Sequence, residues 1–429
     1  VNALMTAGQL INWGMPTLAT EMLNALDCQR TLSLYLQASL LPKAERGELV
    51  AKAIDVFPQF VRFPNTLEEV AALESIEECW FARHLLACFY YNKRSYNKAI
   101  TLWQSCVEMS PEFADGWRGL AIHAWNKQHD YELAARYLDN AYQLAPQDAR
   151  LLFERDLLDK LSGATPEKRL ARLENNLEIA LKRDDMTAEL LNLWHLTGQA
   201  DKAADILATR KFHPWEGGEG KVTSQFILNQ LLRAWQHLDA RQPQQASELL
   251  HAALHYPENL SEGRLPGQTD NDIWFWQAIC ANAQGDETEA MRCLRLAATG
   301  DRTINIHSYY NDQPVDYLFW QGMALRLLGE QQTAQQLFSE MKQWAQEMAK
   351  TSIEADFFAV SQPDLLSLYG DLQQQHKEKC LMVAMLASAG LGEVAQYESA
   401  RAELTAINPA WPKAALFTTV MPFIFNYVH

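Results

Sequence analysis

The segment 211–223 reads KFHPWEGGEGKVT and gathers two carboxylates, a tryptophan and three glycines between stretches that favour helix. Glu216 and Glu219 stand three residues apart and could accept hydrogen bonds from a polyol or contact a cation. Pro214 ends a helix and the glycines permit positive φ, so a plain loop explains these two residue types. A plain loop explains neither Trp215 nor the carboxylates, and loops on a rigid scaffold commonly carry binding residues. We therefore predict a ligand-binding loop made of His213, Trp215, Glu216, Gly217, Gly218, Glu219 and Gly220.

Two catalytic interpretations fit this loop poorly. A phosphate-binding P-loop requires a glycine where the sequence has Trp215, and a serine or threonine where it has Val222. Glycoside hydrolysis needs two carboxyl groups that face each other across a sugar at roughly 5 to 9 Å. Two acids in one glycine-rich loop are a poor pair for that geometry. Binding of a polyol or a cation remains the chemistry to expect here.

Metal and nucleophile chemistry find little support elsewhere in the chain. His251 and His255 stand four apart on an expected helix and could share a metal ion, but no further ligand has motif spacing. We favour two ordinary helix histidines and predict no metal. The seven cysteines are scattered and contain no C-x-x-C pair, which is typical of reduced thiols in a cytoplasmic core. No residue lies in a nucleophile motif. We expect no cofactor, and no enzymatic activity from this region alone.

Aromatic residues form a second group of candidates. The sequences WFWQA at 274–278 and LFWQG at 318–322 are near-copies of each other. In stacked helical hairpins such segments belong to first helices, which line the concave face, so Trp276 and Trp320 could contact a sugar or a peptide. The alternative is that these large side chains fill the space between paired helices. We predict both tryptophans as ligand-binding residues, while expecting at least half of the aromatics here to be core.

The elements that position these residues are repeats. Segment 80–111 places small Ala87 in one helix and large Trp103 in the next, and ends at Pro111. This is the tetratricopeptide pattern, in which small residues let two helices approach and large ones fill between them. The next unit ends at Pro146, 35 residues later, close to the repeat length of about 34.

The repeat signal returns in the second half of the chain. Ala246, Ala290 and Ala334 each follow a turn and are spaced by 44 residues. The ten extra residues per unit fall in loops between hairpins. No alternating pattern of useful length predicts strands. The fold class that we predict is all-α: a tetratricopeptide-like superhelical solenoid of about ten helical hairpins.

The style of the repeats suggests three parts. We expect an N-terminal tetratricopeptide-like solenoid over 1–210, a glycine-rich WEGGEG loop over 211–224, and a C-terminal solenoid with long inter-hairpin loops over 225–429. The repeats at 80–150 are tight, whereas those at 225–345 carry the long loops.

Composition limits the kinds of partner. The chain has 429 residues and a formal net charge of −16, with no cluster of Lys and Arg. Nucleic acid and anionic membranes require such clusters, so we expect neither as a partner. The last stretch, AALFTTVMPFIFNYVH, is apolar but shorter than the roughly 20 residues of a membrane span, so we interpret it as packing surface. The first residues do not form a signal peptide, and we expect a cytoplasmic protein.

PWEGGEG between helical repeats, followed by QFILNQLLRAW, resembles a particular family. It looks like the C-terminal tetratricopeptide region of a family of large bacterial proteins. Their N-terminal half resembles a galactose-mutarotase-type β-sandwich of unknown function. The resemblance implies a link to carbohydrate metabolism. It does not imply a particular activity. It also implies that the sandwich domain would precede Val1, which would account for the missing initiator methionine.

Three hypotheses about function follow. In the first, the solenoid is a binding and scaffolding region whose partner is another protein or its own mutarotase-like domain. In the second, it is a sensor that holds a sugar through Glu216, Glu219 and nearby aromatic residues. In the third, those glutamates belong to a composite carbohydrate-active site completed by the sandwich domain. We favour the first.

Overall fold

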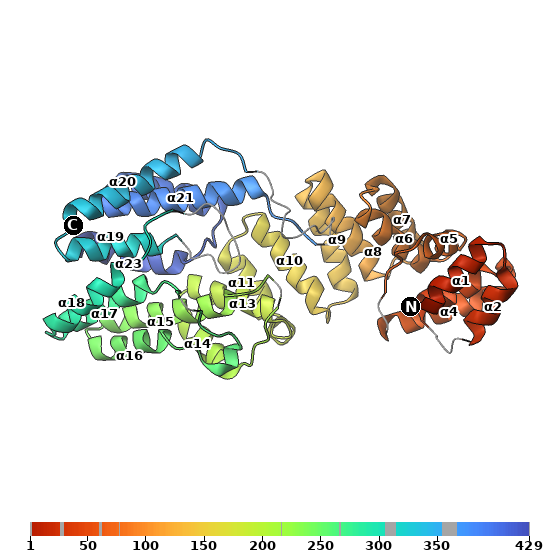
Figure 1. The fold of residues 1–429 in the computed structure, drawn as a ribbon, viewed down its shortest axis with the longest axis horizontal. Coiled ribbons are helices and arrows are strands. Elements are labelled where there is room, and N and C mark those ends of the chain that lie inside the picture. Colours follow the sequence, from red (N-terminus) through yellow and green to blue (C-terminus); the bar gives the residue numbers. More distant parts are fainter. Residues whose placement is uncertain are drawn as a thin grey trace. The chain divides into compact units, whose positions relative to one another are not determined.

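The fold is built from helices throughout the residues that the structure describes (Figure 1). The structure is a computed structural model, and it describes residues 2–25, 30–59, 62–76, 78–215, 217–265, 267–304, 315–353 and 367–428. Within these ranges no residue is in a strand. The all-α prediction is confirmed.

Contacts divide the chain into two compact units. Unit 1 is Val1–Leu158 together with Asp356–Tyr369, and unit 2 is Asp159–Ala355 together with Gly370–His429. A short segment that follows much later in the sequence therefore belongs to the N-terminal unit. The boundary that we expect at 211–224 concerns the style of the repeats and stays a prediction.

Unit 1 contains the first helices of the chain. They are α1 (Asn2–Asn12), α2 (Pro16–Ala25), α3 (Thr31–Ser39), α4 (Gly47–Val56), α5 (Leu67–Glu74), α6 (Trp80–Asn92), α7 (Tyr96–Met109), α8 (Ala114–His123), α9 (Tyr131–Leu144) and most of α10 (Ala149–Leu161). Short 3-10 turns lie at Lys43–Glu45 and Phe57–Gln59, and a π-helical turn follows α8 at Ala124–Gln128.

Unit 2 contains the remaining helices. They are α11 (Pro166–Glu174), α12 (Leu177–Ala180), α13 (Asp184–Leu196), α14 (Ala200–Thr209), α15 (Lys221–Asp239), α16 (Pro243–Ala253), α17 (Asn271–Ala283), α18 (Glu287–Ala297), α19 (Tyr317–Leu327), α20 (Gln331–Met348), α21 (Leu372–Leu391), α22 (Val394–Ile407) and α23 (Ala414–Val428). A 3-10 turn at Glu258–Leu260 lies between α16 and α17.

Side-chain caps start several of the helices. Asp130 accepts a hydrogen bond from the backbone of Leu133 at the start of α9, and Asp286 does the same for Glu289 at the start of α18. At α5, Thr66 and Glu69 form a reciprocal capping box. These side chains satisfy backbone N–H groups that have no partner within the helix. Each cap fixes where one arm of a hairpin begins.

Neighbouring helices pack as hairpins, and the hairpins stack. Close pairs include α6 with α7, α8 with α9, α15 with α16, and α17 with α18. The first helices of successive hairpins also meet, as α13 does with α15 and α17 with α19. This arrangement is a tetratricopeptide-like helical solenoid, so the predicted architecture is confirmed.

Small residues beneath aromatic rings bring the helices close together. A Cβ atom added at Gly322 of α19 would lie 2.3 Å from the ring of Phe338 in α20, and one added at Gly390 of α21 would lie equally close to the same ring. The Phe338 ring is fully buried. Glycine at both positions therefore lets three successive helices share one aromatic side chain, which is how small and large residues pair in such repeats.

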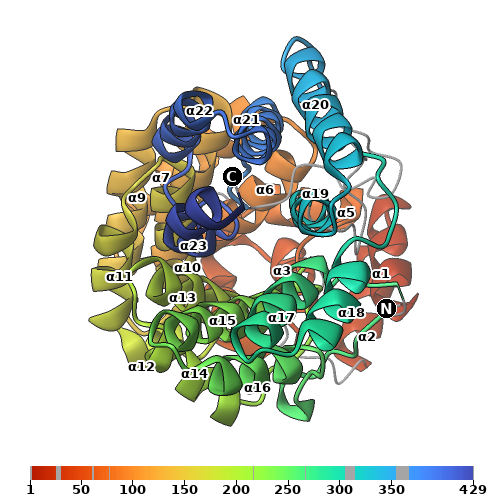
Figure 2. The same ribbon diagram turned by 90° about the vertical axis from the view of Figure 1, so that its left-hand side faces the viewer.

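The C-terminal helix departs from the hairpin pattern. Helix α23 packs against α13, α15 and α19, which are first helices of their hairpins (Figure 2). Its apolar residues join the large core of unit 2, and Leu416, Phe417, Val420 and Ile424 are fully buried. The interpretation of the last stretch as packing surface is confirmed. In the part of the chain that the structure describes, no helix is both long and apolar enough to cross a membrane.

Candidate functional site

Each described glycine of the WEGGEG loop meets a backbone or packing requirement. Gly217 and Gly220 have φ angles of 77° and 75°, the left-handed region that favours glycine. Gly218 is buried under the Trp215 ring, where a Cβ atom would lie 1.9 Å from the indole. Gly220 is also the residue from which α15 starts. Glu216 lies outside the described residues.

A second loop holds the WEGGEG loop in place. The Gly220 N–H donates to Oε2 of Glu262 at 2.7 Å, across 42 positions of sequence. Burial raises the pKa of the Glu262 carboxyl above its usual value, the Gly220 N–H lowers it, and the nearby Glu219 charge raises it. Glu262 thus completes the start of α15 from the loop between α16 and α17.

The same two loops are joined at Phe212 and Asn259. The Phe212 N–H donates to the Asn259 carbonyl at 2.8 Å, and the Ser261 hydroxyl donates to the Phe212 carbonyl at 2.6 Å. The Asn259 side-chain amide donates to the carbonyls of Leu207 and Arg210 at 2.8 and 2.7 Å. Phe212 itself is buried. Polar backbone that no helix satisfies is therefore paired between the two loops.

His213 is held at the edge of this arrangement by Asp184, the first residue of α13. Its N–H donates to Asp184 Oδ2 at 3.0 Å, and its ring Nδ1 lies 3.2 Å from the same oxygen. Arg210 donates to the other oxygen of Asp184 through Nε and Nη2, at 3.0 and 2.6 Å. The His213 side chain is nevertheless 74% exposed.

The described residues of the predicted loop therefore lie together on unit 2. His213 and Glu219 are exposed and Trp215 is partly exposed, and Glu262 lies beside them. An aromatic face, an imidazole and carboxylates can accept hydrogen bonds and pack against an apolar group. The sequence interpretation missed Glu262, and the only available signal was its place in the unusually long loop between two hairpins.

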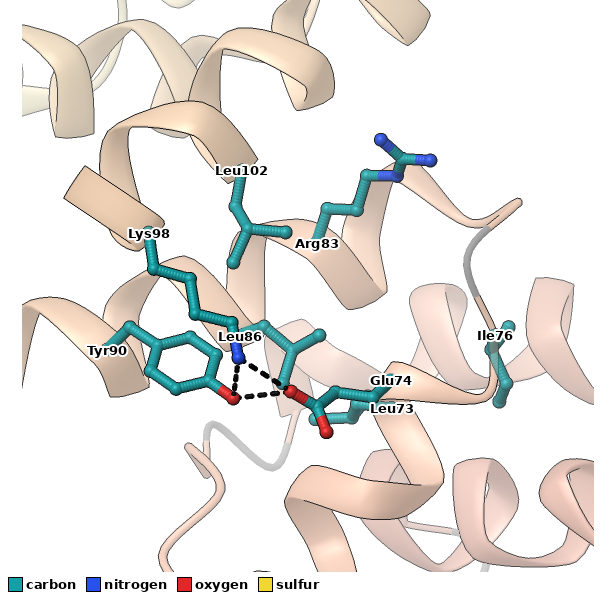
Figure 3. Close-up of a pocket in the computed structure, with 8 residues that line it drawn as sticks. All are labelled: Leu73, Glu74, Ile76, Arg83, Leu86, Tyr90, Lys98 and Leu102. Carbon is teal, nitrogen blue, oxygen red and sulfur yellow. Dashed lines mark hydrogen bonds and ion pairs between the residues drawn. The ribbon is translucent and has the colours of Figure 1, made fainter. Parts of the chain in front are cut away.

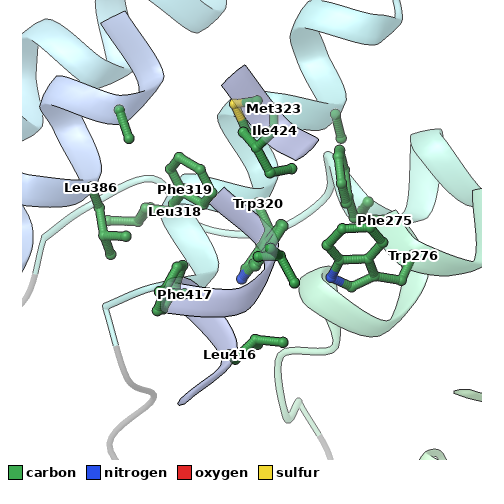
Figure 4. Packing of buried hydrophobic residues seen from close by; sticks show 14 of the residues in the cluster. Phe275, Trp276, Leu318, Phe319, Trp320, Met323, Leu386, Leu416, Phe417 and Ile424 are labelled. Carbon is green, nitrogen blue, oxygen red and sulfur yellow. The ribbon is translucent and has the colours of Figure 1, made fainter. Parts of the chain in front are cut away.

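Trp276 and Trp320 lie elsewhere, in the core of unit 2. Their side chains are 2% and 0% exposed. Trp320 stacks on Phe417 of α23 with ring centroids 5.8 Å apart (Figure 4). Trp276 packs against Phe423 of α23, also with ring centroids 5.8 Å apart. In this structure the core alternative describes both indoles, because α23 covers the side of the first helices on which they lie. Neither indole is presented to a ligand while α23 is in place.

A cavity of about 340 Å³ lies in unit 1 (Figure 3). Leu73, Ile76, Leu86 and Leu102 supply apolar walls, and Glu74, Arg83, Tyr90 and Lys98 supply polar ones. The Tyr90 hydroxyl donates to Glu74, and Lys98 Nζ lies 3.0 Å from the same Glu74 oxygen. The Tyr90 and Lys98 hydrogen bonds lower the pKa of Glu74. Glu74 and Lys98 satisfy each other, and Arg83 donates to the Ser105 hydroxyl, so the cavity is suited to an apolar side chain.

The described histidines and cysteines are the remaining candidates for metal and thiol chemistry. Among the described residues, no group of three or more His, Cys, Asp or Glu side chains is placed to hold a metal ion. The His251 and His255 rings are 5.4 Å apart, and His255 Nδ1 lies 3.3 Å from the His251 carbonyl. The described cysteines are buried free thiols, and burial raises the pKa of Cys106 and Cys280 to about 12. Such thiols are poor nucleophiles.

Comparison with solved structures finds several of low similarity. No protein-family model matches the sequence. A chain of the Naa15/Naa10 complex bound to HypK-THB is 12% identical, with a TM-score of 0.37; the alignment covers 93% of this chain and 63% of that one. The P58(IPK) TPR domain is 13% identical, with a TM-score of 0.24 and coverages of 89% and 97%.

A third similar structure is the Cut9–Hcn1 hetero-tetramer of the APC/C. It is 12% identical, with a TM-score of 0.24, over 99% of this chain and 83% of that one. The chain spans less than two thirds of the length of the Naa15/Naa10 chain. The packing of the described helices as stacked hairpins defines the tetratricopeptide-like solenoid.

Proposed function

We propose that this chain is the tetratricopeptide-like binding and scaffolding region of a larger cytoplasmic bacterial protein linked to carbohydrate metabolism. We further propose that a protein partner docks on His213, Trp215, Glu219 and Glu262, which we call the double-loop surface. The observation that supports this is the mutual bonding of segments 211–220 and 255–265, with polar and aromatic side chains left exposed on top.

Mutual contacts hold the two loops of the double-loop surface in one conformation. Long irregular loops lose much conformational entropy when they are ordered. Gly218 packs under the Trp215 ring, the Glu262 carboxylate accepts from the Gly220 N–H, and the Asn259 amide donates to the Leu207 carbonyl. Together these contacts fix one loop conformation. Binding residues held in this way lose little further entropy when a partner arrives.

The chemistry of the surface suggests what it would contact. Glu219 and Glu262 are acceptors, and the whole chain carries a formal charge of −16. A partner with exposed N–H donors or basic side chains would be attracted, and an apolar group would pack on Trp215. The family resemblance makes the mutarotase-like domain of the same protein the first partner to test.

The test is calorimetric titration of this chain with the separately produced mutarotase-like domain. Loss of a central tryptophan anchor typically weakens binding by about 2 kcal/mol, so Trp215→Ala should raise Kd roughly thirtyfold. Glu258→Gln is the matched control, since Glu258 is an exposed carboxylate of the same second loop. Equal affinity of the wild type and Trp215→Ala would contradict the proposal.

A carbohydrate is the second candidate for this surface. A partly exposed indole beside an exposed carboxylate is a combination that can stack on a sugar ring and accept from its hydroxyls. A sugar at 100 times its Kd should stabilise the chain by about 2.7 kcal/mol in a thermal-shift screen. Glu216→Ala/Glu219→Ala should remove that shift. Turnover that appears only with the mutarotase-like domain attached, and disappears in Glu219→Ala, would indicate the composite enzyme instead.

A further inference from the structure

Unit 1 binds the backbone of a distant segment of its own chain. The Asn126 side-chain amide donates from Nδ2 to the Ser367 carbonyl at 2.8 Å and accepts at Oδ1 from the Tyr369 N–H at 3.0 Å. The neighbouring Trp125 donates from Nε1 to the Tyr369 carbonyl at 2.8 Å. Two adjacent side chains thus make three hydrogen bonds to the main chain of residues 367–369.

A local irregularity places these two side chains. Helix α8 ends in the π-helical turn Ala124–Gln128, and the turn closes at His129, whose φ is 55°. A π turn adds a residue to the helix and rotates the following side chains, which is why such turns often occur at functional sites. Here the turn is the element that carries both Trp125 and Asn126.

The orientation of the Asn126 amide is fixed from its other side. Its Nδ2 also donates to the Tyr91 hydroxyl at 3.3 Å, and Tyr91 is fully buried in α6. Tyr91 packs against the Trp103 and Tyr96 rings at 5.5 and 5.3 Å. With Nδ2 facing two oxygens, Oδ1 is left to accept from Tyr369. The amide is therefore preorganised for a carbonyl and an N–H two residues apart.

The bound segment is recognised mainly through its backbone. The three hydrogen bonds use carbonyl and N–H groups that every peptide carries, and they flank one residue, Leu368, whose side chain is 7% exposed. Backbone pairing supplies affinity and a buried side chain supplies selectivity in extended-peptide recognition. An extended peptide with a leucine-like residue at the centre has the same groups at the same spacing.

We propose that Trp125 and Asn126, with Tyr91 orienting the Asn126 amide, form a binding site for an extended peptide, and that residues 367–369 are an internal ligand that competes with a partner's peptide. The chain on both sides of this segment, up to Ala355 and from Gly370, belongs to unit 2, so the segment is tethered at each end. Tethering gives an effective concentration in the millimolar range, so a partner peptide must outcompete a nearby occupant. This site is separate from the double-loop surface and does not depend on it.

The test uses the full chain and a fluorescein-labelled peptide of sequence PDLLSLYGDLQ, residues 363–373. Fluorescence polarisation is measured with the wild type and with Leu368→Asp, in which a buried leucine becomes charged and the internal segment competes less. The variant should bind the peptide about tenfold or more tightly than the wild type does. Adding Asn126→Ala to Leu368→Asp should abolish that gain.

Two modified peptides test which groups of the peptide the site recognises. Methylation of the Tyr369 amide nitrogen removes the N–H that donates to Asn126 Oδ1 and should abolish binding. Alanine in place of the serine keeps every backbone group and should bind as the parent peptide does. Absence of peptide binding to Leu368→Asp, or binding that ignores both Asn126→Ala and amide methylation, would overturn the proposal.

Hydrogen exchange provides a readout that does not require Leu368→Asp to fold. The Tyr369 amide should exchange slowly in the wild type and at least about tenfold faster in Asn126→Ala, because the hydrogen bond to Oδ1 is lost. Amides of α15, in the other unit, should not change. Unchanged exchange at Tyr369 would show that Asn126 does not hold the segment, and would likewise overturn the proposal.

Discussion

Lys413 Nζ lies 2.6 Å from Asp316 Oδ2, although 97 positions separate the two residues in sequence. The same nitrogen lies 2.9 Å from Asp272 Oδ2. The two aspartates are 44 residues apart, as Trp276 and Trp320 are, so they occupy equivalent positions in successive repeats. Burial disfavours the charged ammonium, but the two carboxylates outweigh it and raise the pKa of Lys413 above its usual value. The lysine that precedes α23 therefore joins α17 to the start of α19.

Replacement of Lys413 by alanine should destabilise unit 2 strongly. The Asp272 and Asp316 side chains are 8% and 2% exposed, so both would be left as buried carboxylates without their cation. Removing one partner of a buried ion pair costs about 3 to 5 kcal/mol. Urea unfolding at pH 7 measures the change.

The matched control for Lys413 is Lys377→Ala. Lys377 forms an ion pair with Glu403 at 2.7 Å, but both side chains are at least half exposed. Exposed pairs contribute about 0 to 1 kcal/mol, so this variant should unfold almost as the wild type does. Similar losses in the two variants would show that the double-aspartate contact is no stronger than a surface pair.

Phe417→Ala should test whether α23 is part of the core. Phe417 is fully buried between Trp320 and Trp411, with ring centroids 5.8 and 6.1 Å away. Truncating a buried phenylalanine to alanine costs about 3 to 5 kcal/mol, because it removes apolar contacts and leaves a cavity. Thr418→Ala, at the next and exposed position, should leave the free energy of unfolding within about 0.5 kcal/mol of the wild type. A small loss for Phe417→Ala would indicate that α23 is only loosely attached.

The sequence predicted the helical hairpins and their stacking, because these depend on local residue spacing. Spacing of small and aromatic residues, such as Ala87 before Trp103 and the two WQ copies 44 apart, was enough for the hairpins and their stacking. The same copies placed Trp276 and Trp320 in first helices. Whether those first helices faced a groove was a different question. Its answer depends on α23, which returns to them from the far end of the chain.

Side chains whose partners lie far away in the sequence show no local sequence pattern. Lys413 meets carboxylates 97 and 141 positions away, Glu262 meets a backbone N–H 42 positions away, and Asn126 meets a segment more than 240 positions away. None of these side chains lies in a motif, because each acts through a contact that exists only after the solenoid has formed. Loops and tertiary ion pairs are therefore the parts of this protein that sequence pattern does not determine.

Gly218→Ala should disturb the double-loop surface without breaking a hydrogen bond. The added methyl would lie 1.9 Å from the Trp215 ring, and a rigid indole cannot yield as a flexible side chain would. Overpacking of this kind costs about 1 to 3 kcal/mol, so the midpoint of urea unfolding should fall. Tryptophan emission should shift to longer wavelength as Trp215 moves into water. Gly263→Ala in the facing loop is the control, since a Cβ atom there meets no atom within 4 Å. Equal behaviour of the two variants would mean that the Trp215–Gly218 contact is not formed.

His195 should make the stability of unit 2 depend on pH. Its ring is buried, Nε2 lies 3.1 Å from Asn229 Nδ2, and Nδ1 lies 3.0 Å from Gln225 Oε1. Nε2 must accept from the Asn229 amide, so a proton on Nε2 would face another donor. Burial lowers the pKa of His195 to about 4, and the Gln225 hydrogen bond opposes this only in part.

The depressed pKa of His195 determines how the free energy of unfolding changes with pH. The contribution of neutral His195 to stability is complete above pH 6.5, the ordinary histidine value, and is lost as the pH falls from 6.5 to 4, because the unfolded chain binds the proton more readily. The free energy of unfolding should therefore drop by about 3 kcal/mol more in the wild type than in His195→Gln over this range. His251→Gln removes an exposed histidine instead, keeps the buried ring, and should retain the wild-type profile. Parallel pH profiles for the wild type and His195→Gln would mean that the ring takes up its proton in the folded protein without opposition from Asn229.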